Sequence, residues 1–193
     1  MGTDRGGVDD LRAALMRDLD AGFERVVRSY EGRLYSFALR MTGDPRDAEE
    51  ATQDAFVRAF RALATWPPER IASMSLAGWL YRITLNVVRN RMRGHRPVLV
   101  GLDGLGAAEP ADRRDGPERV IERAVDRDRL ETMLLTLPER YRAAVVLRHV
   151  EDLSYPEVAE ALGQPLGTVK SNVHRGVALL RAAMSTQQQE VVA

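Results

Sequence analysis

Apolar residues recur at helical spacing in the first third of the chain. The pattern from residue 20 to residue 41 predicts a helix that Gly43 ends. Asp44 and Pro45 then start a second helix, because aspartate caps helix ends and proline suits the first helical position. This second helix is expected to continue to about Ala64.

A third amphipathic helix is predicted over residues 76–93. Before it, Trp66-Pro67-Pro68 breaks the second helix, and a loop continues to Ser73 or Ser75, either of which is a suitable cap. Its apolar face, which we expect in the core, consists of Leu76, Trp79, Leu80, Ile83 and Val87. The other side forms a basic stripe of Arg82, Asn86, Arg89, Asn90 and Arg93. The three helices together predict a small bundle.

After this bundle the composition changes to Gly, Pro, Ala and Asp without a helical period. We therefore predict an all-α protein with two small helical domains joined by a flexible acidic linker. The first domain is expected at residues 20–96, the linker at 97–117 and the second domain at 118–184.

The second domain ends in the pattern of a helix-turn-helix. Pro138 starts one helix, and Ser154 with Glu157 forms a capping box that opens a short helix ending at Gly163. The last helix places Val169, Val173, Val177 and Leu180 on one face. A short capped helix, a glycine-containing turn and a second amphipathic helix are typical of this motif.

Charge is unevenly distributed, although the 193 residues have a formal net charge of zero. Residues 70–96 contain six arginines and no acid, whereas residues 97–162 are acidic overall. Residues 163–184 contain Lys170, Arg175 and Arg181 and again no acid. Two separated basic surfaces indicate two separate contacts with a polyanion.

Several functions are excluded by what the sequence lacks. It contains no cysteine, and its three histidines are far apart, so neither a metal site nor another cofactor is predicted. Phosphate-binding glycine loops and nucleophile motifs are missing, so we do not expect an enzyme. There is no apolar signal region and no apolar run near the roughly 20 residues that span a bilayer. We expect a cytoplasmic protein that does not insert into a membrane.

In a helix-turn-helix, the start of the second helix meets base edges and phosphates in the major groove. With Val169 and Val173 facing inward, the residues left facing outward are Thr168, Lys170, Ser171, Asn172, His174 and Arg175. Their side chains suit contacts with guanine, with other base edges and with phosphate. The alternative is an ordinary exposed helix face without a role in DNA binding.

These segments resemble the extracytoplasmic-function (ECF) sigma factors of bacterial RNA polymerase. The sequences LSYPEVA at 153–159 and GTVKS at 167–171 are similar to that family's last helix-turn-helix, and LPERYR at 137–142 to the start of the same domain. DAEEATQDAF at 47–56 and WLYRI at 79–83 resemble signatures of its first domain. These matches occur in the family's order.

The resemblance implies that the first domain recognises and melts the minus-ten promoter element, and that the second binds the minus-thirty-five element as duplex. The basic stripe would hold the melted strand, and Trp66 and Asn86 would wall a pocket for a flipped base. Pro67-Pro68-Glu69 departs from the family's usual loop, which leaves the base preference open. The alternative for Trp66 is a buried anchor between helices.

The resemblance also implies protein partners. The acidic face of the second helix would meet the clamp helices of the polymerase beta-prime subunit, and it consists of Asp47, Glu50, Gln53 and Asp54. The second domain would contact the beta flap, the linker would thread toward the RNA exit path, and an anti-sigma factor is expected. Without the resemblance, the acidic face is a solvated helix surface and the linker a simple tether.

Two other functions are compatible with parts of the pattern. A stand-alone transcription regulator would use only its helix-turn-helix and would bind its operator without polymerase. A sequestering protein would bind polymerase, or another sigma factor, without supporting initiation. The basic stripe argues against the second.

Overall fold

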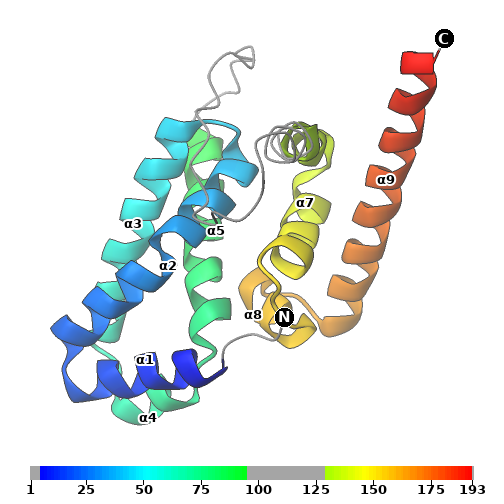
Figure 1. Ribbon diagram of the computed structural model, residues 1–193. Helices are drawn as coiled ribbons and strands as arrows, with labels where there is room; N and C mark the ends of the chain where they lie inside the picture. Colours follow the sequence, from blue (N-terminus) through cyan, green and yellow to red (C-terminus); the bar gives the residue numbers. More distant parts are fainter. Residues whose placement is uncertain (1–4, 95–128, 193) are drawn as a thin grey trace, which may run out of the picture.

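The described part of the chain contains helices and no strand, which confirms the all-α prediction (Figure 1). The computed structural model describes residues 5–94 and 129–192. The predicted linker at 97–117 and the expected start of the second domain lie outside these ranges.

Residues 5–94 form an amino-terminal unit of five helices. These are α1 (Arg5–Arg17), α2 (Leu19–Thr42), α3 (Pro45–Leu63), α4 (Pro68–Ser73) and α5 (Leu76–Gly94). Helices α2, α3 and α5 pack against one another as the predicted bundle, and α1 and α4 lie together at one end of it (Figure 1).

Local sequence signals set the ends of the bundle helices. Gly43 ends α2 in the left-handed region, with φ of 75°, where glycine carries no steric cost. The Asp44 side chain then caps α3 by accepting hydrogen bonds from the backbone N–H groups of Arg46 and Asp47, at 2.8 and 3.1 Å. The predicted break between the first two helices is confirmed.

Two helices of this unit were not predicted. Helix α1 buries Leu11 and Leu15 against the bundle, and together with Val8 these residues recur at a helical spacing that the prediction did not use. Helix α4 occupies most of the region predicted as a loop. Pro68 starts it at the first helical position, and Ile71 anchors it in the core.

Residues 129–192 form a carboxy-terminal unit. Residues 129–136 are helical and are followed by α7 (Glu139–Val145), the π-helical segment η1 (Val146–Val150), α8 (Tyr155–Leu162) and α9 (Leu166–Val192). The capping box before α8 is confirmed, since the backbone N–H of Ser154 donates to Glu157 Oε2 at 2.8 Å. Gly163 ends α8 with φ of 62°. The predicted helix-turn-helix is therefore present as α8, turn and α9.

Segment η1 lies between α7 and the turn that leads to α8, and it contains one residue more than an α-helical turn would. Its hydrogen bonds skip five residues, as in the 2.9 Å bond from the backbone N–H of Glu151 to the carbonyl of Val146. Glu151 follows directly and is buried, with its side chain pointing toward the amino-terminal unit, where its partners lie.

The two units share one hydrophobic core. Helix α5 packs against α8, and the buried cluster continues from Leu80 and Leu85 of the first unit to Leu147 and Val158 of the second. The elements of the two units lie side by side in Figure 1, with α9 on the outer side of the second unit.

Candidate nucleic-acid interface

Helix α5 presents the basic stripe on the side opposite its buried face. Arg82, Asn86, Asn90 and Arg93 are exposed, as predicted, because α5 buries residues such as Leu80 in the core. Arg89 is the exception, with a side chain 26% exposed, and its Nε donates to Glu139 Oε1 at 2.8 Å.

Trp66 lies in the turn between α3 and α4 and packs on Trp79 of α5. Its ring centroid is 4.8 Å from that of Trp79, and the Arg70 guanidinium carbon lies 3.8 Å from the Trp66 centroid. Asn86 is seven residues after Trp79, or roughly 10 Å further along the helix axis. Trp66 thus joins helices as an anchor and remains partly exposed. Arg70 is not among the predicted site residues, and its only signal in the sequence is its place four residues after Trp66.

The first half of α9 carries the predicted recognition residues. Val169 and Val173 are buried, and the exposed set consists of Thr168, Lys170, Ser171, His174 and Arg175. Helix α9 packs against α7 and α8, which hold it in place. This half of α9 therefore presents Lys170 and Arg175 together with three other polar side chains on one exposed surface.

Asn172 does not face outward, and the prediction for its orientation was wrong. The residue is buried at 8% exposure, and its amide nitrogen donates to Gln164 Oε1 at 3.0 Å. Gln164 lies in the turn between α8 and α9, so the bond ties the start of α9 to that turn. The polar side chain of Asn172 suits a position that faces solvent as well as one that faces inward with a hydrogen-bond partner. Its partner Gln164 lies eight residues earlier, outside α9, so the periodicity of the helix does not identify it.

Two tyrosines lie next to the two cations in the first half of α9, and neither was predicted as part of this surface. Lys170 Nζ is 5.8 Å from the ring centroid of Tyr155. Hydrogen bonds from Arg175 and Arg140 lower the pKa of the Tyr141 hydroxyl below its ordinary value, because both cations favour the phenolate. The tyrosines thus help to hold Lys170 and Arg175 in place.

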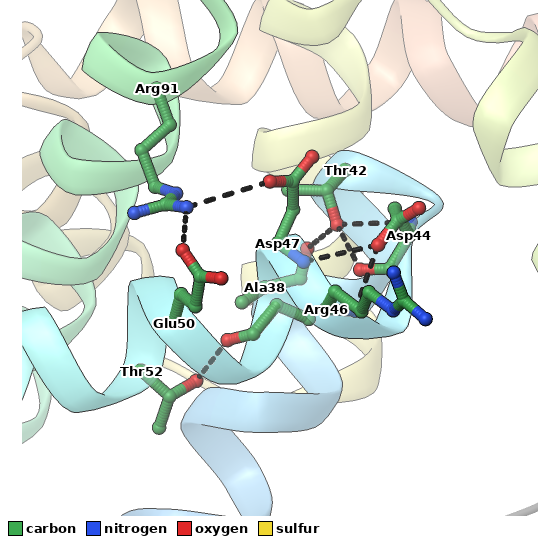
Figure 2. A network of polar contacts seen from close by, with 9 residues as sticks. Ala38, Thr42, Asp44, Arg46, Asp47, Glu50, Thr52 and Arg91 are labelled. Carbon is green, nitrogen blue, oxygen red and sulfur yellow. Dashed lines mark hydrogen bonds and ion pairs between the residues drawn. The ribbon is translucent and has the colours of Figure 1, made fainter.

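The acidic face on α3 is tied to α5 at Asp47 and Glu50, whereas Asp54 and Gln53 have their partners, Arg58 and Glu49, within α3. Figure 2 shows the Arg91 guanidinium of α5 directed at the carboxylates of Glu50 and Asp47, with Asp47 Oδ1 at 3.7 Å. Gln53 and Asp54 are exposed one turn further along. Arg91 therefore joins α3 to α5 and fixes the start of this face.

A groove between α2 and α3 adjoins Gln53. It has a volume of about 720 Å³, and Tyr35 and Phe56 supply much of its apolar lining. Gln53 and Glu49 contribute polar groups from α3. An apolar groove beside exposed acids and amides is suited to bind another protein's helix.

Carboxylates of the second unit face cations of the basic stripe. Glu139 binds Arg89, and Glu160 of α8 faces Arg82. Partial burial raises the pKa of Glu160, and the nearby charge of Arg82 opposes that effect. The described residues contain no group of three or more side chains able to hold a metal ion, and no helix long and apolar enough to cross a membrane.

Comparison with known proteins gives two matches to family models. Residues 26–98 match sigma-70 region 2, and residues 127–180 match sigma-70 region 4. The ECF RNA polymerase sigma factor SigW of Bacillus subtilis is 33% identical over 172 residues, covering 85% of this chain and 89% of SigW. SigE of Mycolicibacterium smegmatis is 36% identical over 87% of this chain, which spans only 63% of that longer protein.

Solved structures confirm the fold. CnrH in complex with the cytosolic domain of CnrY aligns with a TM-score of 0.68 at 23% identity, covering 93% of this chain and 98% of CnrH. RpoE in complex with the anti-sigma factor NepR, from Bartonella quintana, aligns with a TM-score of 0.62 at 21% identity, covering 84% of this chain and 96% of that chain.

Proposed function

Because this chain belongs to the ECF sigma factors, which direct RNA polymerase core to specific promoters, we propose roles for its two basic helices. The basic stripe of α5 holds and melts the minus-ten element, with Trp66 and Asn86 beside the flipped base. The start of α9 enters the major groove of the minus-thirty-five element. We infer that the family's two regions extend over residues 20–96 and 118–184, with α1 packed on the first region from outside it and α9 continuing past the second.

The observation that carries this proposal is the presence of two exposed cationic helix faces on different units of one sigma-family chain. Each face offers few base contacts, so each domain alone is expected to bind weakly. When one domain binds its promoter element, it raises the effective concentration of the other domain at the second element only if the distance between the domains matches the spacing of the two elements. Polymerase supplies that fit by fixing the distance between the units.

We extend the proposal to the protein partners. Gln53 and Asp54, together with Asp47, Glu50 and the groove between α2 and α3, bind the beta-prime clamp helices, and the carboxy-terminal unit binds the beta flap. Both aligned structures contain a complex of two proteins, and in the Bartonella quintana structure the partner of the sigma factor RpoE is the anti-sigma factor NepR. We propose that an anti-sigma factor binds this chain too. The protein acts in the cytoplasm, without a cofactor, and leaves catalysis to polymerase.

Run-off transcription with purified core polymerase on genomic fragments tests the function, beginning with the DNA upstream of this protein's own gene. Core alone should give no specific transcript, and core with the chain should give one. Asn86→Ala should reduce promoter opening, measured by permanganate reactivity, and leave core binding unchanged. Arg61→Ala is the control, because Arg61 is exposed on α3 outside the proposed surfaces. A footprint obtained without core would instead support a stand-alone regulator.

A further inference from the structure

Helix α1 holds the end of α4 through one arginine. Arg12 Nη1 donates hydrogen bonds to the carbonyl oxygens of Ala72 and Met74, at 3.1 and 2.8 Å. Ala72 lies in the last turn of α4 and Met74 follows its last residue, where a helix has no donor of its own for these carbonyls. Asp9 of α1 pairs with Nη2 of the same guanidinium. Arg12 therefore satisfies the end of α4 and connects it to α1.

Apolar contacts fix the same two helices on the bundle. Leu11 and Leu15 of α1 are buried, and so is Ile71 of α4. Helix α1 packs along α2 as well as on α4, and a Cβ atom at Gly22 of α2 would lie only 2.5 Å from the backbone nitrogen of Leu15. A helix of six residues is too short to be stable by itself. The position of α4 therefore depends on its contacts with α1.

Helix α4 in turn places Arg70 on Trp66. The Arg70 guanidinium carbon is 3.8 Å from the Trp66 ring centroid, so the guanidinium covers a face of the indole. Trp79 packs on the same ring, with the two centroids 4.8 Å apart. These two neighbours leave little of the Trp66 ring on which another aromatic group could stack. Trp66 by itself is therefore a poor surface for an extruded base.

The Arg70 guanidinium is available to a ligand. Arg70 is exposed, and within residues 5–94 and 129–192 its guanidinium forms no hydrogen bond or ion pair. A guanidinium plane stacks on nucleic-acid bases, and its N–H groups donate to base edges or phosphate. Because the side chain already rests on Trp66, it loses less conformational entropy on binding than a mobile arginine would. Arg70 comes directly after Pro67-Pro68-Glu69, where the sequence departs from the family's usual loop.

We propose that Arg70, supported from behind by Trp66, is the surface on which an extruded minus-ten base rests, and that Arg12 of α1 is the positioning residue that holds α4 and Arg70 there. The contact with the base rests on the proposed role of this pocket in minus-ten recognition. The hold of α1 on Arg70 does not, because it is a property of the free chain and is measurable without promoter or polymerase.

Tryptophan fluorescence tests the positioning role in the free chain. The chain has two tryptophans, so Trp79→Phe leaves Trp66 as the only one, and quenching by acrylamide then reports access to its ring. In this background, Arg70→Ala should raise the Stern–Volmer quenching constant because the ring loses its cover. Arg12→Ala should also raise it, because the end of α4 loses its attachment to α1.

Two further variants separate positioning from a general loss of charge or stability. Arg12→Lys should restore part of the protection, since an ammonium group still donates to a carbonyl of α4. Arg25→Ala is the matched control, because it removes one cation from an exposed α1–α2 ion pair with Asp10 and leaves α4 attached. Its quenching constant should equal that of the parent. Equal quenching in Arg12→Ala and the parent would overturn the positioning role.

The base contact is measured with the holoenzyme by fluorescence anisotropy. The probe is a labelled fork-junction DNA from the promoter that run-off transcription identifies, single-stranded over the minus-ten element, with each of these bases replaced in turn by an abasic residue. At one position the abasic residue should weaken binding by the parent about tenfold, as the loss of one stacked base does. Arg70→Ala should weaken binding of the unmodified DNA by a similar factor, and binding of this abasic DNA no further. Arg70→Lys keeps the charge without the plane and should behave like Arg70→Ala.

The outcomes distinguish this inference from the proposed function. An equal loss for all the DNAs, abasic ones included, would make Arg70 a phosphate contact and overturn its contact with a base. If an abasic position weakens binding by the parent but Arg70→Ala binds every DNA as the parent does, only the role of Arg70 fails. If no abasic position weakens binding, the proposed minus-ten function fails and the base contact with it, whereas the quenching experiment still decides whether Arg12 positions Arg70.

Discussion

The hydroxyl of Tyr81 donates a hydrogen bond to the buried carboxylate of Glu151, 70 positions later in the chain. This contact joins the first half of α5 to the residue that follows η1. Both side chains are almost completely buried. Removing either partner should therefore change the free energy of unfolding far more than removing one member of a surface pair. The stability of the protein should therefore report on this pair directly.

Replacing Glu151 by alanine should destabilise the protein by about 3 kcal/mol, because Arg33, Arg40 and the Tyr81 hydroxyl lose their partner. Chemical denaturation followed by circular dichroism measures this change. The control is Glu24→Ala, which breaks only an exposed pair with Arg28 and should cost less than about 1 kcal/mol. Equal costs for the two variants would contradict the importance of the buried charge.

The pH dependence of stability should change when Tyr81 is replaced by phenylalanine. Burial, followed by the charge of Glu151, raises the pKa of Tyr81 above its ordinary value of 10.0. Tyr81 thus ionises more readily in the unfolded chain, so it stabilises the fold below about pH 10 and loses that contribution as the pH rises further. Tyr81→Phe should flatten the fall of the unfolding free energy above pH 10.

Tyr141 provides the opposite sign as a control for that measurement. Its pKa is lowered, chiefly by the hydrogen bond with Arg175, so it ionises more readily in the folded chain and adds stability as the pH rises. Tyr141→Phe should therefore steepen the fall of the unfolding free energy at high pH. Slopes that changed in the same direction for both variants would contradict the two assigned environments.

Lys170→Ala and Arg175→Ala should each weaken binding of the minus-thirty-five element by about 1–3 kcal/mol if the side chain contacts a base edge. If the contact is with phosphate, binding should weaken by the same factor for every DNA sequence. The slope of the logarithm of the binding constant against the logarithm of the salt concentration should then fall in magnitude by about 1. Electrophoretic mobility shifts with the holoenzyme, at several salt concentrations, separate these outcomes. Arg181→Ala removes the same charge from the exposed second half of α9 and should have little effect.

Asn172→Ala and Gln164→Ala should destabilise the carboxy-terminal unit by similar amounts, about 1 kcal/mol each, because each removes one partner of the same hydrogen bond. The double variant should cost less than the sum of the two. Thermal unfolding of the three variants tests this coupling. Additive costs, together with loss of promoter binding in Asn172→Ala alone, would instead assign Asn172 to the DNA surface.

Much of the fold follows from local signals in the sequence. The ends of α2, α3 and α8 depend on Gly43, Asp44 and the Ser154 capping box, each of which acts within a few residues of itself. Helical periodicity predicts the exposed side of α5 and the burial of Leu76, Leu80 and Val87. Trp79 and Ile83 are only partly buried, and Tyr81, Leu85 and Val88 are buried although the predicted face did not include them. Because of the same periodicity, the exposed positions of the basic stripe and of most recognition residues on α9 agree with the prediction.

The contacts between the units could not be predicted in this way. The Arg33–Glu151 pair joins residues 118 positions apart, and a single polar residue carries no periodic signal that identifies its partner. The same reason explains why Asn172 was assigned to the exposed set, and why Tyr141 and Tyr155 were missed. Helix α1 was missed for a different reason: Val8, Leu11 and Leu15 recur at helical spacing, but the predicted helices begin only at residue 20.

The π-helical segment η1 sets the direction in which Glu151 points. Its hydrogen bonds span five residues where an α-helix spans four, so the segment contains one residue more than the α-helical register needs. Deleting one residue from it would return the chain to that register and turn all that follows by roughly 100°, the rotation of one α-helical residue. Glu151 would then turn away from Tyr81, and α8 and α9 would rotate with it. The length of this short segment is therefore as strict a requirement as any side chain in the protein.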